Sequence, residues 1–224
     1  MLPPAMIHRI RKVLLALAGL VIVGAEPASA HPHVWVTMKT ELVYAPDGSI
    51  TAVRHAWSFD DMFSAFALQG IESKKKGQYT REELKPLAQT NVESLKEFDY
   101  FTYAKVNGNK VEFAGPQNDY YLDYKDSVLT LHFTLPFKAP VKASDLDVEI
   151  YDETFFVDFS FDEKDKEPAK LVGAPAACKL AVKRPGQLDP DLAQRLSQLP
   201  ADATVDPSLM LGSQYANGLT VKCP

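Results

Sequence analysis

Two stretches of alternating apolar and polar residues predict a β-hairpin early in the chain. In residues 33–44 the side chains of Val34, Val36 and Met38 fall on one face, and polar side chains fall on the other. This period of two is typical of a half-buried strand. Residues 50–59 alternate in the same way, and Asp47-Gly48 between the two stretches is a strong hairpin-turn signal.

The turn also predicts the pairing register of the hairpin. A turn centred on Asp47-Gly48 places Met38 opposite Trp57 and Glu41 opposite Arg54, so that apolar residues meet and opposite charges meet. The further pairs on the apolar face are Val36 with Phe59 and Leu42 with Val53. The same register places Asp60 opposite Trp35, close to His33.

Helical spacing predicts two or three helices. Residues 61–70 carry apolar side chains at helical spacing and end on Gly70. Residues 80–98 open with the Thr80–Glu83 capping-box pattern, and residues 190–199 follow the acidic cap residue Asp189. Further short alternating runs predict strands at residues 101–106, 110–113, 120–124, 128–135, 147–151, 155–161 and 178–183. The pattern therefore predicts an α+β fold, mainly antiparallel and sandwich-like.

The first 30 residues have the features of a cleavable signal peptide. Arg9, Arg11 and Lys12 precede an apolar run over residues 13–25, and Ala28-Ser29-Ala30 offers small residues for cleavage. The run is shorter than the roughly 20 residues that span a bilayer. We expect export to the periplasm, a single domain over residues 31–224, and no membrane insertion after cleavage.

The two cysteines, Cys178 and Cys223, are expected to form a disulfide in an oxidising compartment. The bond would tether a tail of residues 184–224 and stabilise the fold by roughly 3 kcal/mol. Two isolated cysteines lack the close spacing of zinc motifs.

The net charge makes two classes of partner less favourable. Cleavage after Ala30 leaves 194 of the 224 residues, with 21 Lys and Arg against 28 Asp and Glu, a net charge of −7. An acidic surface disfavours nucleic acid and anionic lipid, but not cations.

The expected mature start, His31-Pro32-His33, could bind a metal ion. A terminal histidine offers its α-amine and imidazole together, and imidazole suits nickel, copper and zinc. Pro32 has no N–H, which blocks binding through deprotonated backbone amides. Asp60 and Asp61 could add carboxylate ligands, although either would also serve as a helix N-cap. These residues are also typical of an ordinary polar chain end.

Other candidate ligands follow from the strand patterns. His132 lies on the polar face of residues 129–135 and could supply a third imidazole, though no spacing ties it to the chain start. Asp152 and Glu153 are a further acidic pair. His55 shares a face with Val53 and Trp57, so we expect a core histidine. The aromatic clusters are more typical of core packing than of a ligand site.

Three separated motifs resemble a known family. His-Pro-His-Val-Trp35, Trp57-Ser-Phe-Asp-Asp-Met-Phe-Ser64 and Tyr151-Asp-Glu-Thr-Phe-Phe156 are similar to the bacterial periplasmic family called domain of unknown function 1007. The family is often labelled the periplasmic component of an uncharacterised ABC-type transport system, and its genes commonly lie beside those of nickel and cobalt permeases. The resemblance implies an accessory to metal transport with an inner-membrane permease as partner, and it implies no reaction.

Three functions are consistent with these observations. The first is a non-enzymatic periplasmic protein that binds nickel, cobalt, zinc or copper through His31, His33, Asp60, Asp61 and His132. The second is a copper-dependent oxidative enzyme with an amino-terminal histidine brace. The third is a binding or assembly module without metal. The absence of any recognisable substrate groove in the sequence favours the first over the second.

Overall fold

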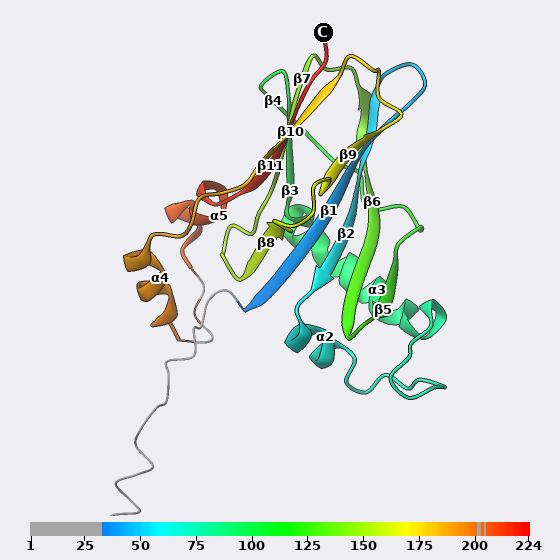
Figure 1. The fold of residues 1–224 in the computed structure, drawn as a ribbon, viewed down its shortest axis with the longest axis vertical. Helices are drawn as coiled ribbons and strands as arrows, with labels where there is room; N and C mark the ends of the chain where they lie inside the picture. The colour runs from blue at the N-terminus through cyan, green and yellow to red at the C-terminus, as the bar shows by residue number, and fades with distance from the viewer. Residues whose placement is uncertain (1–32, 201–202, 204) are drawn as a thin grey trace, which may run out of the picture.

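Two β-sheets that share one core make up most of the fold in the computed structural model, which describes residues 33–200, 203 and 205–224 (Figure 1). The expected signal peptide and His31 lie outside the described residues. Strands dominate, most of them pair antiparallel, and the longest helix packs into the core through Leu84, Ala88 and Val92. The structure confirms the predicted α+β class.

The first sheet has the order β5-β6-β2-β1-β8. Its strands are β1 (Val34–Tyr44), β2 (Ile50–Phe59), β5 (Tyr121–Lys125), β6 (Val128–Val141) and β8 (Val157–Phe161), and β9 (Ala169–Val172) also pairs with β1. The β1–β2 register is the predicted one, with Met38 opposite Trp57 and Glu41 opposite Arg54. Arg54 Nη1 and Glu41 Oε2 lie 2.6 Å apart, as the cross-strand charges require.

Two pairings of β1 are parallel, which the sequence patterns do not predict. β8 and β9 both run parallel to β1, with Trp35 opposite Asp158 and Thr40 opposite Ala169. Parallel strands need a long crossover. Here the connection from β1 to β8 is a long segment of the chain, which includes two helices and three of the five strands of the second sheet.

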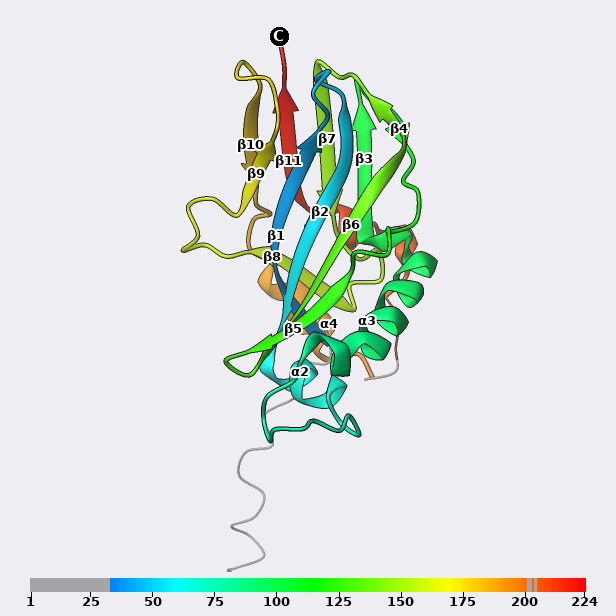
Figure 2. The ribbon, with the colours of Figure 1, turned by 90° about the vertical axis from the view of Figure 1, so that its right-hand side faces the viewer.

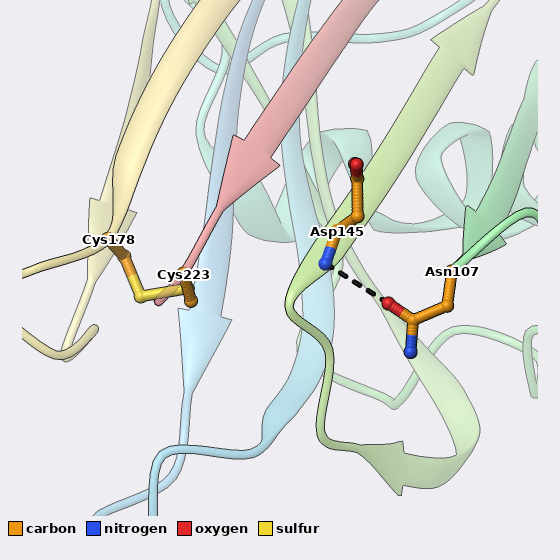
Figure 3. The surroundings of a disulfide bond; sticks show 4 residues. All are labelled: Asn107, Asp145, Cys178 and Cys223. Atoms are coloured by element: carbon orange, nitrogen blue, oxygen red, sulfur yellow. Dashed lines mark hydrogen bonds between the residues drawn. A yellow bond between two sulfur atoms is a disulfide. The ribbon is translucent and has the colours of Figure 1, made fainter.

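The second sheet is antiparallel throughout, in the order β10-β11-β7-β3-β4. Its strands are β3 (Thr102–Val106), β4 (Asn109–Val111), β7 (Asp145–Ile150), β10 (Lys179–Lys183) and β11 (Asn217–Lys222). The expected tail thus contributes an internal strand, because β11 lies between β7 and β10. The predicted disulfide joins Cys178 to Cys223 beside this pair (Figure 3).

The core lies between the two sheets and is centred on Trp57. This side chain is fully buried and packs edge-on against Phe133, with ring centroids 4.8 Å apart. Trp57 also contacts Phe159 of β8 and Phe101 beside β3. Inward residues of β7 and β11, such as Val148, complete the same cluster.

The helices begin where the capping residues predict. Thr80 and Glu83 form a reciprocal capping box at the start of α3 (Arg81–Leu95), and Asp189 caps α4 (Pro190–Ser197). The first helix, α2 (Asp61–Ala67), ends before Gly70. The remaining helical segments are 3₁₀ turns at Lys96–Phe101 and Pro207–Leu209 and the short α5 (Leu211–Gln214). Among the described residues, none of these helices is long and apolar enough to cross a membrane.

Candidate functional site

His33 lies at the start of β1, against the loop that leads into β8. Its backbone N–H donates to the carbonyl of Phe156 at 2.8 Å, and its imidazole packs on the Phe156 ring with centroids 4.6 Å apart. The parallel register then pairs Trp35 with Asp158. The first residues of β1 therefore lie beside the first residues of β8.

A buried carboxylate shapes the loop that brings β8 to this position. Asp152 accepts hydrogen bonds from the backbone N–H groups of Thr154, Phe156 and Val157 at 2.8–3.0 Å, and from the hydroxyl of Thr154. These bonds satisfy both carboxylate oxygens inside the protein. Asp152, a possible metal ligand in the sequence, therefore has a structural role in the described fold.

Asp60 lies where the hairpin register predicts, but its carboxylate caps a helix. Its backbone N–H donates to the carbonyl of Trp35 at 3.0 Å, and Trp35 N–H donates back to Asp60 Oδ2 at 3.0 Å. Asp60 Oδ1 accepts from the N–H of Phe63 at 2.8 Å, which makes Asp60 the N-cap of α2. Asp61 is exposed in the first turn of this helix.

His132 lies far along the sheet from His33. His132 of β6 pairs with Ala56 of β2, and Ala56 pairs with Lys39 of β1. Lys39 lies six residues after His33 along β1. Six residues of strand rise about 20 Å. The structure therefore does not bring His132 to the start of β1.

His132 belongs instead to a cluster beside α3. It stacks on the ring of Tyr121, and its Nε2 lies 3.5 Å from Asp123 Oδ2. The guanidinium of Arg81 binds Asp123 through two nitrogens and lies 3.6 Å from the centre of the Tyr121 ring. Burial lowers the pKa of His132, while Asp123 opposes the shift and Arg81 adds to it.

His55 is the core histidine that the sequence predicts. Only 1% of its surface is exposed, and its two ring nitrogens lie 3.2 Å from the hydroxyls of Thr40 and Thr102. Burial lowers the pKa of His55 to about 3, because the charged ring would lose its hydration.

Asp158 is a site residue that the sequence analysis did not single out. It lies on β8 opposite Trp35, on the face that also carries His33 and Phe156. Neighbouring strands lie about 4.8 Å apart and two residues rise about 6.6 Å, so the backbones of Asp158 and His33 are separated by about 8 Å. At that separation an imidazole and a carboxylate can reach one ion. In the sequence, Asp158 alternates with the apolar residues Phe159 and Phe161, which predicts that it lies on the opposite face of the strand. A polar residue on that face normally points to solvent, so the pattern alone does not indicate a site.

The Asp158 carboxylate is half-buried and lacks a compensating charge. Within the described residues it makes no hydrogen bond and no ion pair. Burial raises the pKa of Asp158, because the charged form loses hydration. A cation beside it would offset this cost.

An open cleft of about 710 Å³ adjoins Asp158 along the outer edge of β8. Its lining includes Thr37, Asp158, Arg184 and Tyr215. Arg184 Nη2 donates to the carbonyl of Asp162 at 3.3 Å. Asp158 is therefore reachable from solvent.

The imidazole and carboxylate groups at the start of β1 are suitable ligands for a transition metal ion. The described residues supply too few such groups to complete a site. Imidazole nitrogen and carboxylate oxygen are ordinary ligands for nickel, cobalt, zinc and copper. In the described part of the chain, no group of three or more His, Cys, Asp or Glu residues could hold a metal ion. A site at this position needs further donors, and His31 lies outside the described residues.

Comparison with known proteins gives a family but no activity. A family model described as "Protein of unknown function (DUF1007)" matches residues 16–223. The "Uncharacterized 15.5 kDa protein in trpE 3'region" of Spirochaeta aurantia is 30% identical over 88 residues. The matched segment is 39% of this chain and 62% of that protein, so the match spans less than two thirds of the relative.

Proposed function

We propose a function for this chain, which belongs to the family described as "Protein of unknown function (DUF1007)": it binds a divalent transition metal ion at the start of β1. We further propose that it does so in the periplasm, as an accessory to an inner-membrane metal permease. The ion is cargo, and the chain is not an enzyme.

The observation that carries the proposal is the position of Asp158. It is a half-buried carboxylate with no hydrogen bond or ion pair among the described residues, and it lies diagonally across from His33 on the same face. A carboxylate in that state binds a cation at lower cost than one already paired, because no existing interaction is lost.

Two further donors come from the chain start produced by cleavage. The α-amine and imidazole of His31 can bind one ion together, and Pro32 prevents the competing backbone-amide mode. The set of His31, His33 and Asp158 then offers nitrogen and oxygen ligands without cysteine. Asp60 and Asp61 remain candidates in sequence only, since the oxygens of Asp60 already accept backbone N–H groups.

Isothermal titration with Ni²⁺, Co²⁺, Zn²⁺ and Cu²⁺ tests the proposal. The protein is prepared with His31 as its first residue, and a second form carries one additional glycine before His31. We expect one ion per chain for at least one of the metals, with affinity weakened at least tenfold by the added glycine.

Substitutions test the role of the carboxylate. Asp158→Asn keeps the shape but removes the charge, and we expect at least a tenfold loss of affinity. Asp126→Asn, at an exposed turn between β5 and β6, is the matched control and is expected to bind like the parent. No heat of binding for any of the four ions, or equal affinity in all forms, contradicts the proposal.

A further inference from the structure

The short helix α2 presents two large apolar side chains to solvent. Met62 is 69% exposed and Phe66 is 66% exposed, and their i,i+4 spacing places them on one face. Isolated exposed apolar residues are normal on proteins, but a helical pair this exposed on a seven-residue helix is a contiguous feature.

The opposite face of α2 packs on the body of the protein, so the orientation that exposes Met62 and Phe66 is fixed by the fold. Phe63 packs on Phe59 with ring centroids 4.6 Å apart. Ser64 is fully buried, and its hydroxyl accepts from the N–H of Leu129 at 3.0 Å and donates to the carbonyl of Phe59. Rotation of α2 to bury Met62 and Phe66 would break both hydrogen bonds.

Trp35 is a third exposed apolar side chain, and its backbone lies at the start of the helix. It is 41% exposed and is joined to the cap residue Asp60 by two hydrogen bonds. Tryptophan is enriched where proteins meet the headgroup region of membranes. We call Trp35, Met62 and Phe66 the α2 surface.

Three consecutive lysines follow α2. Lys74, Lys75 and Lys76 are all exposed in the loop before α3. The loop is held in place because Glu83 accepts from the N–H of Lys74 at 2.8 Å, and Gln78 N–H donates to the carbonyl of Lys75 at 2.9 Å. The loop and α2 together form one end of the molecule, the end opposite the carboxyl terminus (Figure 2).

Acidic residues also lie near this end of the molecule. Asp61 and Glu72 are the exposed acidic residues between α2 and the loop, whereas Asp60 and Glu83 accept hydrogen bonds from backbone N–H groups. Residues 60–83 carry five acidic and four basic residues, so the positive charge at this end is confined to the run Lys74–Lys76. Charges act over a Debye length of about 10 Å, so the local sign matters more than the total at a charged surface.

We propose that this end of the molecule binds the surface of an anionic phospholipid bilayer, with the α2 surface entering the headgroup region and Lys74–Lys76 contacting lipid phosphates. Basic residues beside exposed apolar ones are the pattern of interfacial attachment. The first strand, β1, begins at the same end (Figure 2). This inference is independent of the proposed metal binding, although it would place the start of β1 at the membrane.

Co-sedimentation with protein-free vesicles tests the inference. The probes are vesicles of phosphatidylglycerol with phosphatidylethanolamine, and vesicles of phosphatidylcholine alone, with the chain that begins at His31. We expect sedimentation with the anionic vesicles only, weakened by 0.5 M salt and unchanged by a metal chelator. The chelator arm separates this inference from the proposed metal site.

Paired variants distinguish binding through the α2 surface from nonspecific adsorption of exposed apolar side chains. Met62→Ser with Phe66→Ser is expected to weaken partition at least tenfold, whereas Leu209→Ser with Met210→Ser, an equally exposed apolar pair elsewhere, is expected to leave it unchanged. Lys74→Gln with Lys75→Gln is expected to weaken partition about thirtyfold, since each basic residue near an anionic surface contributes about fivefold. Lys105→Gln with Lys110→Gln on β3 and β4 is the charge control.

Three outcomes would overturn the inference. They are no sedimentation with anionic vesicles, equal effects of the test and control pairs, and binding to native membranes but not to protein-free vesicles. The last outcome would indicate a protein receptor in place of lipid.

Discussion

At the scale of single residues, the fold satisfies some of the candidate ligands with hydrogen bonds and leaves Asp158 without one among the described residues. Asp152 and Asp60 bind backbone N–H groups with both carboxylate oxygens. His55 is enclosed by two threonine hydroxyls. Asp158 has no such partner in the described fold, and this contrast separates a candidate ligand from structural carboxylates.

Burial of His55 predicts a pH dependence of stability. The pKa of His55 is about 3 in the folded protein and near 6.5 when the chain unfolds. Between these values the unfolded chain binds a proton that the folded protein does not, so the free energy of unfolding falls as pH decreases. We expect a loss of about 2–3 kcal/mol between pH 7 and pH 4.5 from this residue.

Urea unfolding at both pH values measures this effect. In His55→Gln, which keeps hydrogen-bonding groups near Thr40 and Thr102, the loss on acidification should be smaller by about that amount. His132→Gln, a half-buried histidine, serves as a comparison. Equal pH dependence in the parent and His55→Gln would contradict the assignment.

At the scale of elements, the approach of β8 to β1 depends on the loop after β7 and on α5. Gly212 of α5 lies so close to this loop that a Cβ atom would collide with the backbone carbonyl of Asp152. Backbone cannot move aside as the end of a side chain can. The position of α5 is therefore coupled to the loop that positions Phe156 against His33.

Gly212→Ala should destabilise the protein by about 1–3 kcal/mol, because the added methyl group overpacks a rigid contact. Chemical denaturation measures the loss. Gly186→Ala, where a Cβ would meet nothing within 4 Å, is the matched control and should change stability by less than about 1 kcal/mol. Similar losses in the two variants would show that the close approach is not the cause.

The elements also show how far local pattern predicts this fold. The β1–β2 register follows from the sequence because a tight turn fixes which residues meet, and the α3 capping box is equally local. Three features were not predicted: the parallel pairing of β1 with β8, the internal position of β11, and the place of Asp158 beside Trp35. Each depends on contacts between segments far apart in the chain, which alternation cannot specify.

At the scale of the whole molecule, the disulfide connects the last strand to the body of the protein. Cys178 and Cys223 flank the paired strands β10 and β11, and the bridged segment spans 45 residues (Figure 3). Because β11 is internal to the second sheet, its loss would expose both β7 and β10. The disulfide therefore stabilises the whole second sheet and not only the carboxyl-terminal segment.

Replacing both cysteines by serine should lower the free energy of unfolding by about 3–4 kcal/mol, since the unfolded chain regains the entropy of an open loop of this length. Thermal unfolding with and without reductant measures the change. Reductant should lower the melting temperature of the parent and leave that of the double variant unchanged. A parent that is insensitive to complete reduction would contradict the prediction.

The parallel pairing of β1 also determines the order in which the chain can fold. β1 comes first, yet two of its neighbours, β8 and β9, begin more than a hundred residues later. A chain that emerges with its amino end leading must keep one edge of β1 unpaired until β8, which begins at Val157, has followed, and such late long-range pairing slows folding. The surface that carries His33 is thus among the last to form, so an incomplete or truncated chain would lack it even where the β1–β2 hairpin is intact.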